Sequence, residues 1–511
     1  MSFASGGRIA KNTILLYARM LIILVITLYT SRVILDALGE DDFGIYNVIG
    51  GVVVLFSFLT SALTNATQRY LNYHLGLGEK GNVHKIFNIA TLAHFTILLI
   101  IFVFAETIGL WFVETQLNLP NERFVAARWV YQMTVIATLL NIMVVPYRSS
   151  IIATERMSVF AYISIFEVIL RLIVALVLTY VVIDRLIIYS ILITIVSLLS
   201  YSAYRGICRY TLHFTRFKFE WDKSLFRELL MFSSWYLLGG AAQVGSKQGV
   251  NILLNIFFNV GVNAAVGIAN QIRNAVFGFV TSFQTAFNPQ IVKLYASGEY
   301  DKLIILIYRS TKLSYYLLFI ISLPVIVFCD RILALWLVEV PEYTVVFSQL
   351  VIITSVFEAL STPLWTAIGA TGKIKNYQII VSLIICLDIP IVYFVLKIGY
   401  SPMMAFGINI VINFFAYIYR LLYIRKFVNY SILNYLSFVI IPCLYVTFIV
   451  SPLAVFVSKF TTSLFSSFFM ICMIVFVTVM TIYILGINRE ERHFLNKQIV
   501  AVAKSLKGLI L

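Results

Sequence analysis

The sequence alternates between long apolar stretches and short polar connections. A helix needs about 20 mostly apolar residues to cross a bilayer. Fourteen stretches meet this requirement, and they lie near 12–37, 43–72, 86–113, 124–150, 158–182, 185–208, 226–258, 262–292, 303–330, 343–370, 376–397, 402–424, 433–457 and 462–487. Each is far longer than the roughly 9–11 residues of a barrel strand. The sequence therefore predicts an all-α polytopic membrane protein with about 14 transmembrane helices.

Composition supports this class. Hydrophobic residues make up 61% of the 511 residues and charged residues only 12%, whereas soluble domains have about 45–50% and about 25%. A water-soluble enzyme is excluded. The five cysteines are scattered without paired spacing, so neither a disulfide framework nor a metal site is predicted.

The basic residues that account for the net charge of +15 are unevenly distributed. They gather in the even-numbered connections between the predicted spans, above all in the basic and aromatic connection 205–225. Cytoplasmic loops are enriched in Lys and Arg, so both termini are expected in the cytoplasm. The positive charge is expected to face anionic membrane lipids, and no nucleic-acid partner is needed to explain it.

Two sets of residues recur at a fixed offset. Gly44, Asn47 and Asn65 match Gly267, Asn270 and Asn288 at an offset of 223, and the segments 146–156 and 363–373 match at 217. Each repeat holds six spans, so the copies point the same way and are related by an axis along the membrane normal.

The predicted organisation is therefore two lobes and an extension. An N-terminal lobe (1–210, helices 1–6) precedes a C-terminal lobe (211–430, helices 7–12) and two extra helices (431–487). In 488–511, apolar residues recur every three or four positions, which predicts an amphipathic cytoplasmic tail lying on the inner leaflet.

The opening segment 6–49, its Gly–Asn pattern repeated in span eight, and PYRSSIIATERM at 146–157 resemble a Wzx-type polysaccharide (O-antigen) flippase of the multidrug/oligosaccharidyl-lipid/polysaccharide exporter (MOP) superfamily. This resemblance implies a V-shaped pair of six-helix lobes in a bacterial inner membrane. It also implies alternating-access translocation of undecaprenyl-pyrophosphate-linked oligosaccharide (an O-antigen or capsule repeat unit) to the periplasmic leaflet, alongside a polysaccharide polymerase. Many O-antigen flippases have twelve spans and lipid II flippases fourteen, so the branch stays open.

Flipping breaks no bond, so a transporter and not an enzyme is expected. A diphosphate that crosses the membrane needs basic residues, because guanidinium and ammonium groups bind phosphate strongly. Arg19, Lys247 and Arg273 lie inside spans on helices that line the cavity in the resembling family, and have no acidic neighbour at helical spacing. They are the predicted diphosphate ligands. Arg32, about 220° around the helix from Arg19, is a weaker candidate.

Further polar residues lie in the same helices. The predicted sugar-binding or cavity amides, each equally compatible with an interhelical hydrogen bond, are Asn47, Asn65, Gln68, Gln243, Asn270 and Asn288. Glu167 and Arg171 stand four residues apart and predict a structural ion pair. The acidic sequence at 39–44 is interpreted as a turn and not as a metal site.

Two other functions are considered. A drug or cation antiporter of the same superfamily would use a carboxylate in the early helices of a lobe, but the candidate acids lie in other spans: Glu106, Glu167, Glu358 and Asp388. Coupling to Na+, H+ or the membrane potential therefore stays open. A membrane polymerase or glycosyltransferase would need a large outer domain, which no connection provides. No cofactor is predicted.

Overall fold

The computed structural model describes residues 3–54, 57–115, 121–258, 260–337, 340–459, 464–488 and 491–492. Across these ranges the chain is almost entirely helical and contains no strand, which confirms the all-α fold class. Most of the predicted amphipathic tail (488–511) lies outside them.

Eleven helices in this part of the chain are long and apolar enough to cross a membrane. They coincide with eleven of the fourteen predicted spans. The other three, 43–72, 226–258 and 262–292, are also helical but more polar. Two of these more polar helices, 226–258 and 262–292, carry Lys247 and Arg273 respectively.

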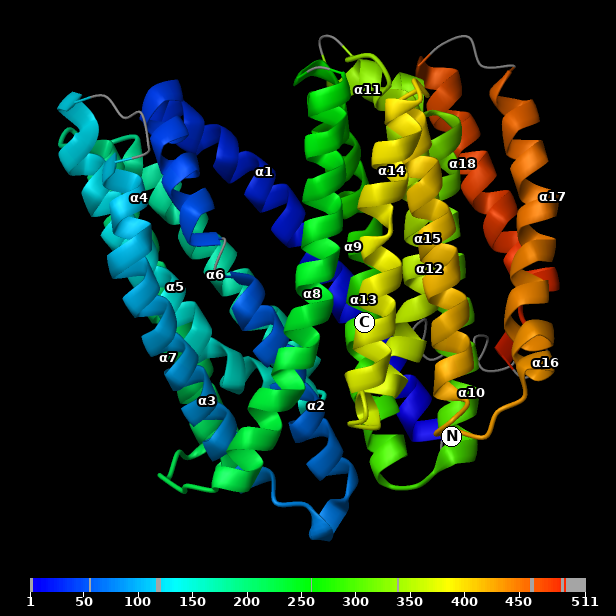
Figure 1. Ribbon diagram of the computed structural model, residues 1–511, viewed down its shortest axis with the longest axis horizontal. Helices are drawn as coiled ribbons and strands as arrows, with labels where there is room; N and C mark the ends of the chain where they lie inside the picture. Colours follow the sequence, from blue (N-terminus) through cyan, green and yellow to red (C-terminus); the bar gives the residue numbers. More distant parts are fainter. Residues whose placement is uncertain are drawn as a thin grey trace, which may run out of the picture. The chain divides into compact units, whose positions relative to one another are not determined.

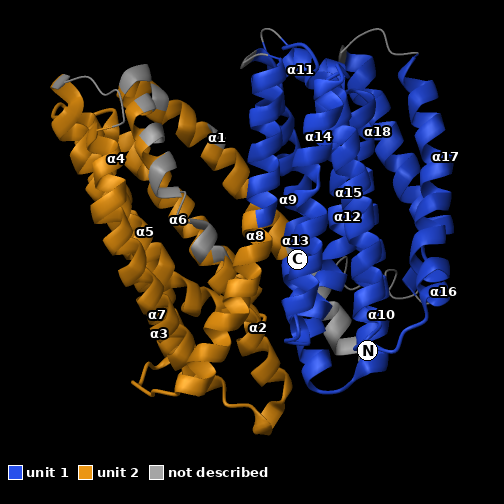
Figure 2. Cartoon of the chain, viewed as in Figure 1, with its two compact units in different colours: residues 1–13, 242–511 blue, residues 14–241 orange. Residues whose placement is uncertain are grey.

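The chain forms two compact units, coloured separately in Figure 2. One comprises residues 14–241, and the other comprises residues 1–13 and 242–511. The boundary falls inside one long helix at 241–242, whereas the predicted lobe boundary is at 210–211. The two helices predicted after 430 belong to the second unit.

In the unit of residues 14–241, α5 is the central helix and packs against α2, α3 and α7 (Figure 1). A π-helical turn, Ala105–Gly109, joins α3 to α4. The helices are α1 (Phe3–Val54), α2 (Ser57–Gly76), α3 (Val83–Phe104), α4 (Leu110–Thr115), α5 (Phe124–Ala153), α6 (Met157–Leu178), α7 (Arg185–Thr211) and the beginning of α8 (Lys223–Phe257).

In the unit that contains residues 242–511, α12 has the equivalent place and packs against α9, α10 and α15. Besides the end of α8, the helices are α9 (Val260–Ala296), α10 (Tyr300–Val327), α11 (Cys329–Trp336), α12 (Thr344–Ala370), α13 (Lys375–Cys386), α14 (Asp388–Lys397), α15 (Met403–Ile424), α16 (Ile432–Tyr435), α17 (Ile441–Ser458) and α18 (Leu464–Thr481).

The backbone carries the internal repeat at the ends of the two central helices. α5 ends at Ala153 and α12 at Ala370. Two residues after the end of each of these helices, the backbone adopts a left-handed conformation, at Glu155 (φ 60°) and Gly372 (φ 74°). These positions differ by 217, the offset found in the sequence. A non-glycine residue there costs about 1–2 kcal/mol, so an unusual backbone feature is shared by both copies.

The acidic segment at 39–44 forms a bend with an ion-pair network. Gly39 adopts φ 79° and ψ 169°, which interrupts α1. Beyond the bend, Asp42 binds the guanidinium of Arg123, which lies 2.7 Å from a carboxylate oxygen of Asp184. The hydrogen bonds that Arg123 donates to Asp42 hold the pKa of Arg123 above its usual value. Asp42 thus forms an ion pair beside the bend at Gly39.

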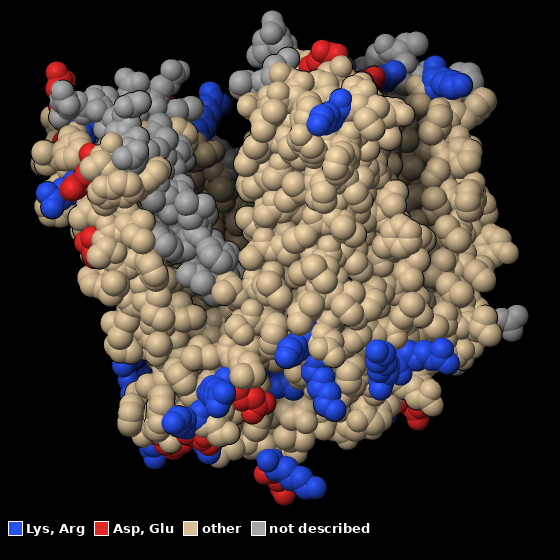
Figure 3. Space-filling view, viewed as in Figure 1, with Lys and Arg blue, Asp and Glu red and all other residues tan. Residues whose placement is uncertain are grey.

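The connection between α7 and α8 is held against the start of α3. Lys85 Nζ lies 2.7 Å from a carboxylate oxygen of Asp222, and this contact lowers the pKa of Asp222. The backbone N–H of Lys218 donates to Asn88 Oδ1 at 3.1 Å. Within each unit, Figure 3 shows most lysines and arginines at the lower end, below a broad band of uncharged side chains.

The end of the last helix is attached to α10 by two contacts. Lys312 Nζ lies 2.6 Å from Glu491 Oε2, and both side chains are largely buried. The hydroxyl of Tyr316 donates to the carbonyl of Gly486 at 2.8 Å. The two helices outside the repeat are therefore joined to the second unit by a buried ion pair and a buried hydrogen bond.

Candidate functional site

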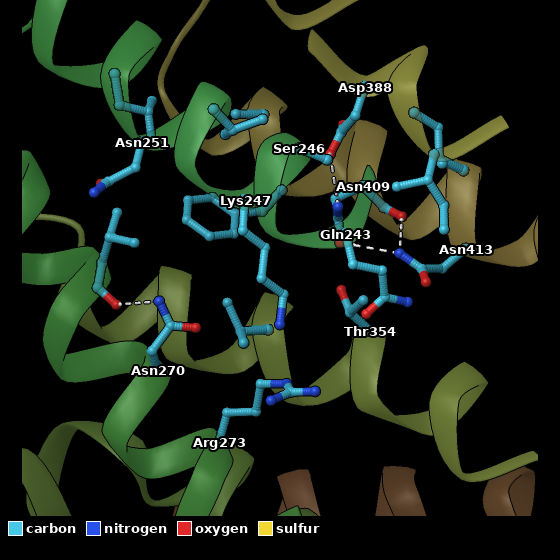
Figure 4. Close-up of a pocket in the computed structure, with 18 of the residues that line it drawn as sticks. Gln243, Ser246, Lys247, Asn251, Asn270, Arg273, Thr354, Asp388, Asn409 and Asn413 are labelled. Atoms are coloured by element: carbon cyan, nitrogen blue, oxygen red, sulfur yellow. Dashed lines mark hydrogen bonds between the residues drawn. The ribbon is translucent and has the colours of Figure 1, made fainter. Parts of the chain in front are cut away.

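A cavity of about 100 Å³ lies inside the unit of residues 242–511. Its walls come from α8, α9, α12, the α13–α14 junction and α15. On α8, residues 243, 246, 247, 250, 251 and 254 line it at helical spacing. Figure 4 shows that polar side chains from several helices converge on this space.

One wall of the cavity is basic. Arg273 of α9 donates to a carboxylate oxygen of Glu358 on α12, and its guanidinium also donates to Asn274 Oδ1 at 3.2 Å. Lys247 of α8 has no carboxylate within 4.0 Å among the described residues. Figure 4 shows the Lys247 ammonium and the Arg273 guanidinium extending toward one another. The wall thus holds one paired and one unpaired cation.

The other side of the cavity holds a buried carboxylate. Asp388 begins α14, directly after the junction with α13, and is only 1% exposed. Its Oδ2 accepts hydrogen bonds from Ser246 Oγ and Asn409 Nδ2, both at 2.8 Å. Its Oδ1 is buried and accepts no hydrogen bond. Buried polar groups are normally satisfied by protein or water, so this oxygen can accept a further hydrogen bond or contact a cation.

A second amide orients the first. Asn413 Nδ2 donates to Asn409 Oδ1 at 3.1 Å, one turn along α15. This bond directs the amide nitrogen of Asn409 toward Asp388. The two cations and two carboxylates named so far give the cavity a formal charge of zero.

Four of the predicted site residues come together here. Gln243, Lys247, Asn270 and Arg273 all line the cavity. Asn288 belongs to the same unit but does not line it. Instead it accepts a hydrogen bond from Thr366 Oγ1 of α12 at 3.1 Å, which is an interhelical contact.

The other predicted residues belong to the unit of residues 14–241. The Arg19 guanidinium lies 4.4 Å from the centre of the Phe160 ring, and its Nε has no hydrogen-bond partner. Arg171 donates to Glu167 Oε1 at 2.8 Å. Arg32 is exposed, and the amides Asn65 and Gln68 are half-buried. The side chain of Asn47 lies outside the described part of the structure.

Sequence reasoning missed several lining residues. Ser246, Thr354, Asn409 and Asn413 were not predicted for the site, and Glu358 and Asp388 were recognised only as acids in spans. One usable signal existed. Asn409 and Asn413 are four residues apart in an apolar helix, which places both amides on one face. Ser and Thr in membrane helices give no such signal, because they often bond to their own backbone, as Thr354 does.

Comparisons with known proteins agree with this architecture. The MatE family model matches residues 246–394, a segment that includes Lys247, Arg273 and Asp388. No curated protein matches the chain.

Several solved structures share the fold. A multidrug resistance MATE family transporter of the MOP superfamily, in an outward-facing conformation, has a TM-score of 0.72 at 10% identity, covering 84% of this chain and 98% of that one. The MATE transporter ClbM in complex with Rb+ gives 0.68 at 14% identity over 84% and 96%. The Vibrio cholerae MATE transporter VcmN in the bent form gives 0.64 at 15% over 85% and 100%. Residues 246–394 therefore match the MatE family model, and the chain has the fold of these MATE transporters.

Proposed function

We propose that this protein is a flippase that moves undecaprenyl-pyrophosphate-linked oligosaccharide from the cytoplasmic to the periplasmic leaflet of a bacterial inner membrane by alternating access. The fold of MATE transporters supports a transport function. The resemblance of the opening segment and of 146–157 to Wzx-type flippases supports the lipid-linked oligosaccharide as cargo, with the termini and basic connections in the cytoplasm.

The observation that carries this proposal is the unpaired Lys247 beside Arg273. A charged side chain at the centre of a membrane helix costs at least about 2.5–3.5 kcal/mol. A cation kept in a cavity without a carboxylate partner, next to a second cation, is best explained by an anionic ligand. A diphosphate fits, because it accepts charge-assisted hydrogen bonds from both ammonium and guanidinium groups.

The size of the cavity limits what enters it. A volume of about 100 Å³ holds a phosphate-sized group or several waters, but not an oligosaccharide. The sugars and the lipid must therefore lie outside it, with the diphosphate as the anchored part. Gln243 and Asn270, at the cavity wall, are candidates for the first polar groups beyond the phosphate. Arg19, in the unit of residues 14–241, is proposed separately as a phosphate ligand of that unit.

A cation antiporter is the second candidate, and Asp388 is the observation that favours it. A buried carboxylate with one unsatisfied oxygen is suited to bind a proton or a metal cation. The same residue also fits the flippase, where it would couple the cycle to Na+ or H+. Asp388 alone therefore does not favour the antiporter over the flippase, and the cargo must be measured.

The test is head-group translocation in proteoliposomes that carry a fluorescent undecaprenyl-pyrophosphate oligosaccharide. Loss of one charge-assisted hydrogen bond costs about 1.5–3 kcal/mol, so Lys247→Ala and Arg19→Ala are each expected to lower flipping at subsaturating lipid about tenfold or more. Lys397→Ala, at the end of α14 beside Tyr393 and outside the cavity, is the matched control and should flip normally.

The outcomes are distinct. Normal flipping by both Lys247→Ala and Arg19→Ala would place the diphosphate elsewhere. Absence of flipping by the wild type, together with sodium- or proton-driven uptake of an organic cation such as ethidium, would replace the flippase with the antiporter.

A further inference from the structure

We propose that the Glu358 carboxylate forms an ion pair with Arg273 while the cavity is empty, and that the phosphate of the substrate takes its place on Arg273 when it binds. This inference rests on the proposed function and names the step by which the anion is admitted and selected. Glu358 would then set the affinity and specificity of the site without being a ligand of the substrate.

The geometry of the pair fits an exchangeable contact. The Arg273 side chain is 13% exposed and that of Glu358 is 25% exposed, and both line the cavity. The ion pair uses one terminal nitrogen of the guanidinium, and the other terminal nitrogen donates to Asn274. A guanidinium offers five N–H donors in a planar fork. A phosphate oxygen pair can engage that fork at two points, whereas Glu358 is held at one.

The energetics also favour exchange. A buried ion pair gains little net free energy, because desolvation offsets most of the attraction, but removing one partner is strongly destabilising because it leaves an uncompensated charge. Glu358 therefore prevents Arg273 from being left as an isolated buried charge. Replacing one anion by another avoids that cost, so the cavity can stay ready for phosphate without binding it permanently.

Lys247 makes the exchange selective. Its ammonium extends toward Arg273 and is not paired with a carboxylate in the described structure. An anion that reaches both cations can contact Lys247 directly, whereas Glu358 attracts Lys247 only from beyond ion-pair distance. A diphosphate satisfies this condition better than a single carboxylate. Neutral sugars and organic cations do not, since neither can replace Glu358 on the guanidinium.

The test measures inorganic pyrophosphate binding by the purified full-length protein in nanodiscs, using isothermal titration calorimetry. Glu358→Gln keeps the shape and removes the competing charge, so it is expected to bind pyrophosphate about tenfold more tightly than the wild type. Glu358→Asp shortens the side chain by one methylene and should tighten binding less. Glu299→Gln removes an exposed carboxylate that is paired with Lys302, and should leave the affinity unchanged.

A double-mutant cycle completes the design. If Glu358 acts through Arg273, then Arg273→Gln with and without Glu358→Gln will bind pyrophosphate equally weakly. Unchanged or weaker binding by both Glu358→Gln and Glu358→Asp, with wild-type size-exclusion profiles, would overturn the proposal. Flipping of the lipid-linked oligosaccharide is measured separately in proteoliposomes. Tighter pyrophosphate binding without any flipping rejects the proposed cargo alone, and flipping with unchanged pyrophosphate affinity rejects the role of Glu358 alone.

Discussion

Asp388→Asn should be more stable than the wild type without a bound cation, and less stable than the wild type when a cation is bound. In the wild type, two donors at 2.8 Å satisfy Oδ2, while the buried Oδ1 has no partner. Asparagine keeps one oxygen for both donors and removes the charge. Hydrogen bonds to a charged group are worth about 1.5–3 kcal/mol and neutral ones about 0.5–1.5, so the two weakened bonds cost about 2 kcal/mol in total.

The gain from removing the charge is larger. Burying an incompletely paired carboxylate costs several kcal/mol. Without a bound cation, Asp388→Asn is therefore expected to be more stable than the wild type by about 1–3 kcal/mol. A cation on Oδ1 reverses this order at 1,000 times its Kd, because it then stabilises the wild type by about 4.1 kcal/mol.

The assay is thermal unfolding of the purified protein in choline chloride, in sodium chloride and at acidic pH. The wild type should rise in Tm with sodium or with acid, and Asp388→Asn should respond to neither. Asp330→Asn, on the surface of α11, is the control and should follow the wild type. The reasoning fails if Asp388→Asn is less stable in every condition and the wild type responds to neither cation.

Three further predictions concern the scaffold. Gly372→Ala should lower the free energy of unfolding by about 1–2 kcal/mol, because its φ of 74° is left-handed; Gly407→Ala, inside α15 with open space around it, should instead gain about 0.5–1 kcal/mol. Glu491→Gln should cost about 3–5 kcal/mol by leaving Lys312 unpaired, and adding Lys312→Met should restore most of the loss in a thermal-unfolding cycle. The lowered pKa of Asp222 predicts that its contribution to anchoring the 212–222 connection is present above about pH 4 and is lost as pH falls through that lowered pKa, which hydrogen exchange of this segment would detect.

The helical class and most spans were predictable because hydropathy is a local property. Eleven predicted spans needed only length and apolar composition. The repeat was also visible, since Glu155 and Gly372 stand at the offset found in the sequence. The boundary of the compact units inside α8 was not predictable, because it depends on which helices pack together.

The site was only half predictable, for a related reason. Lys247 and Arg273 stand out as charges in apolar surroundings. The other contacts of the site join helices that are distant in sequence: Glu358 is 85 residues from Arg273, and Asp388 is 142 residues from Ser246. Helical spacing within one span carries no information about such pairs. An acid with no basic neighbour on its own helix, such as Glu358, could have been matched only by considering all spans at once.

The charges in the cavity lead to a condition on the transport cycle. Lys247 and Arg273 balance Glu358 and Asp388, so the empty cavity is formally neutral. A diphosphate diester brings two negative charges into a region of low dielectric, where uncompensated charge is costly. A cation on the free oxygen of Asp388 offsets one of them, and neutralisation of the displaced Glu358 would offset the other.

If both proposals hold, each lipid-linked diphosphate should bind together with positive charge, and sodium or protons should raise its affinity. The same coupling requires the diphosphate to raise the affinity for the cation by the same factor. A diphosphate affinity that does not change with sodium or pH, in a protein that still flips, would show that the charge is compensated from outside this cavity.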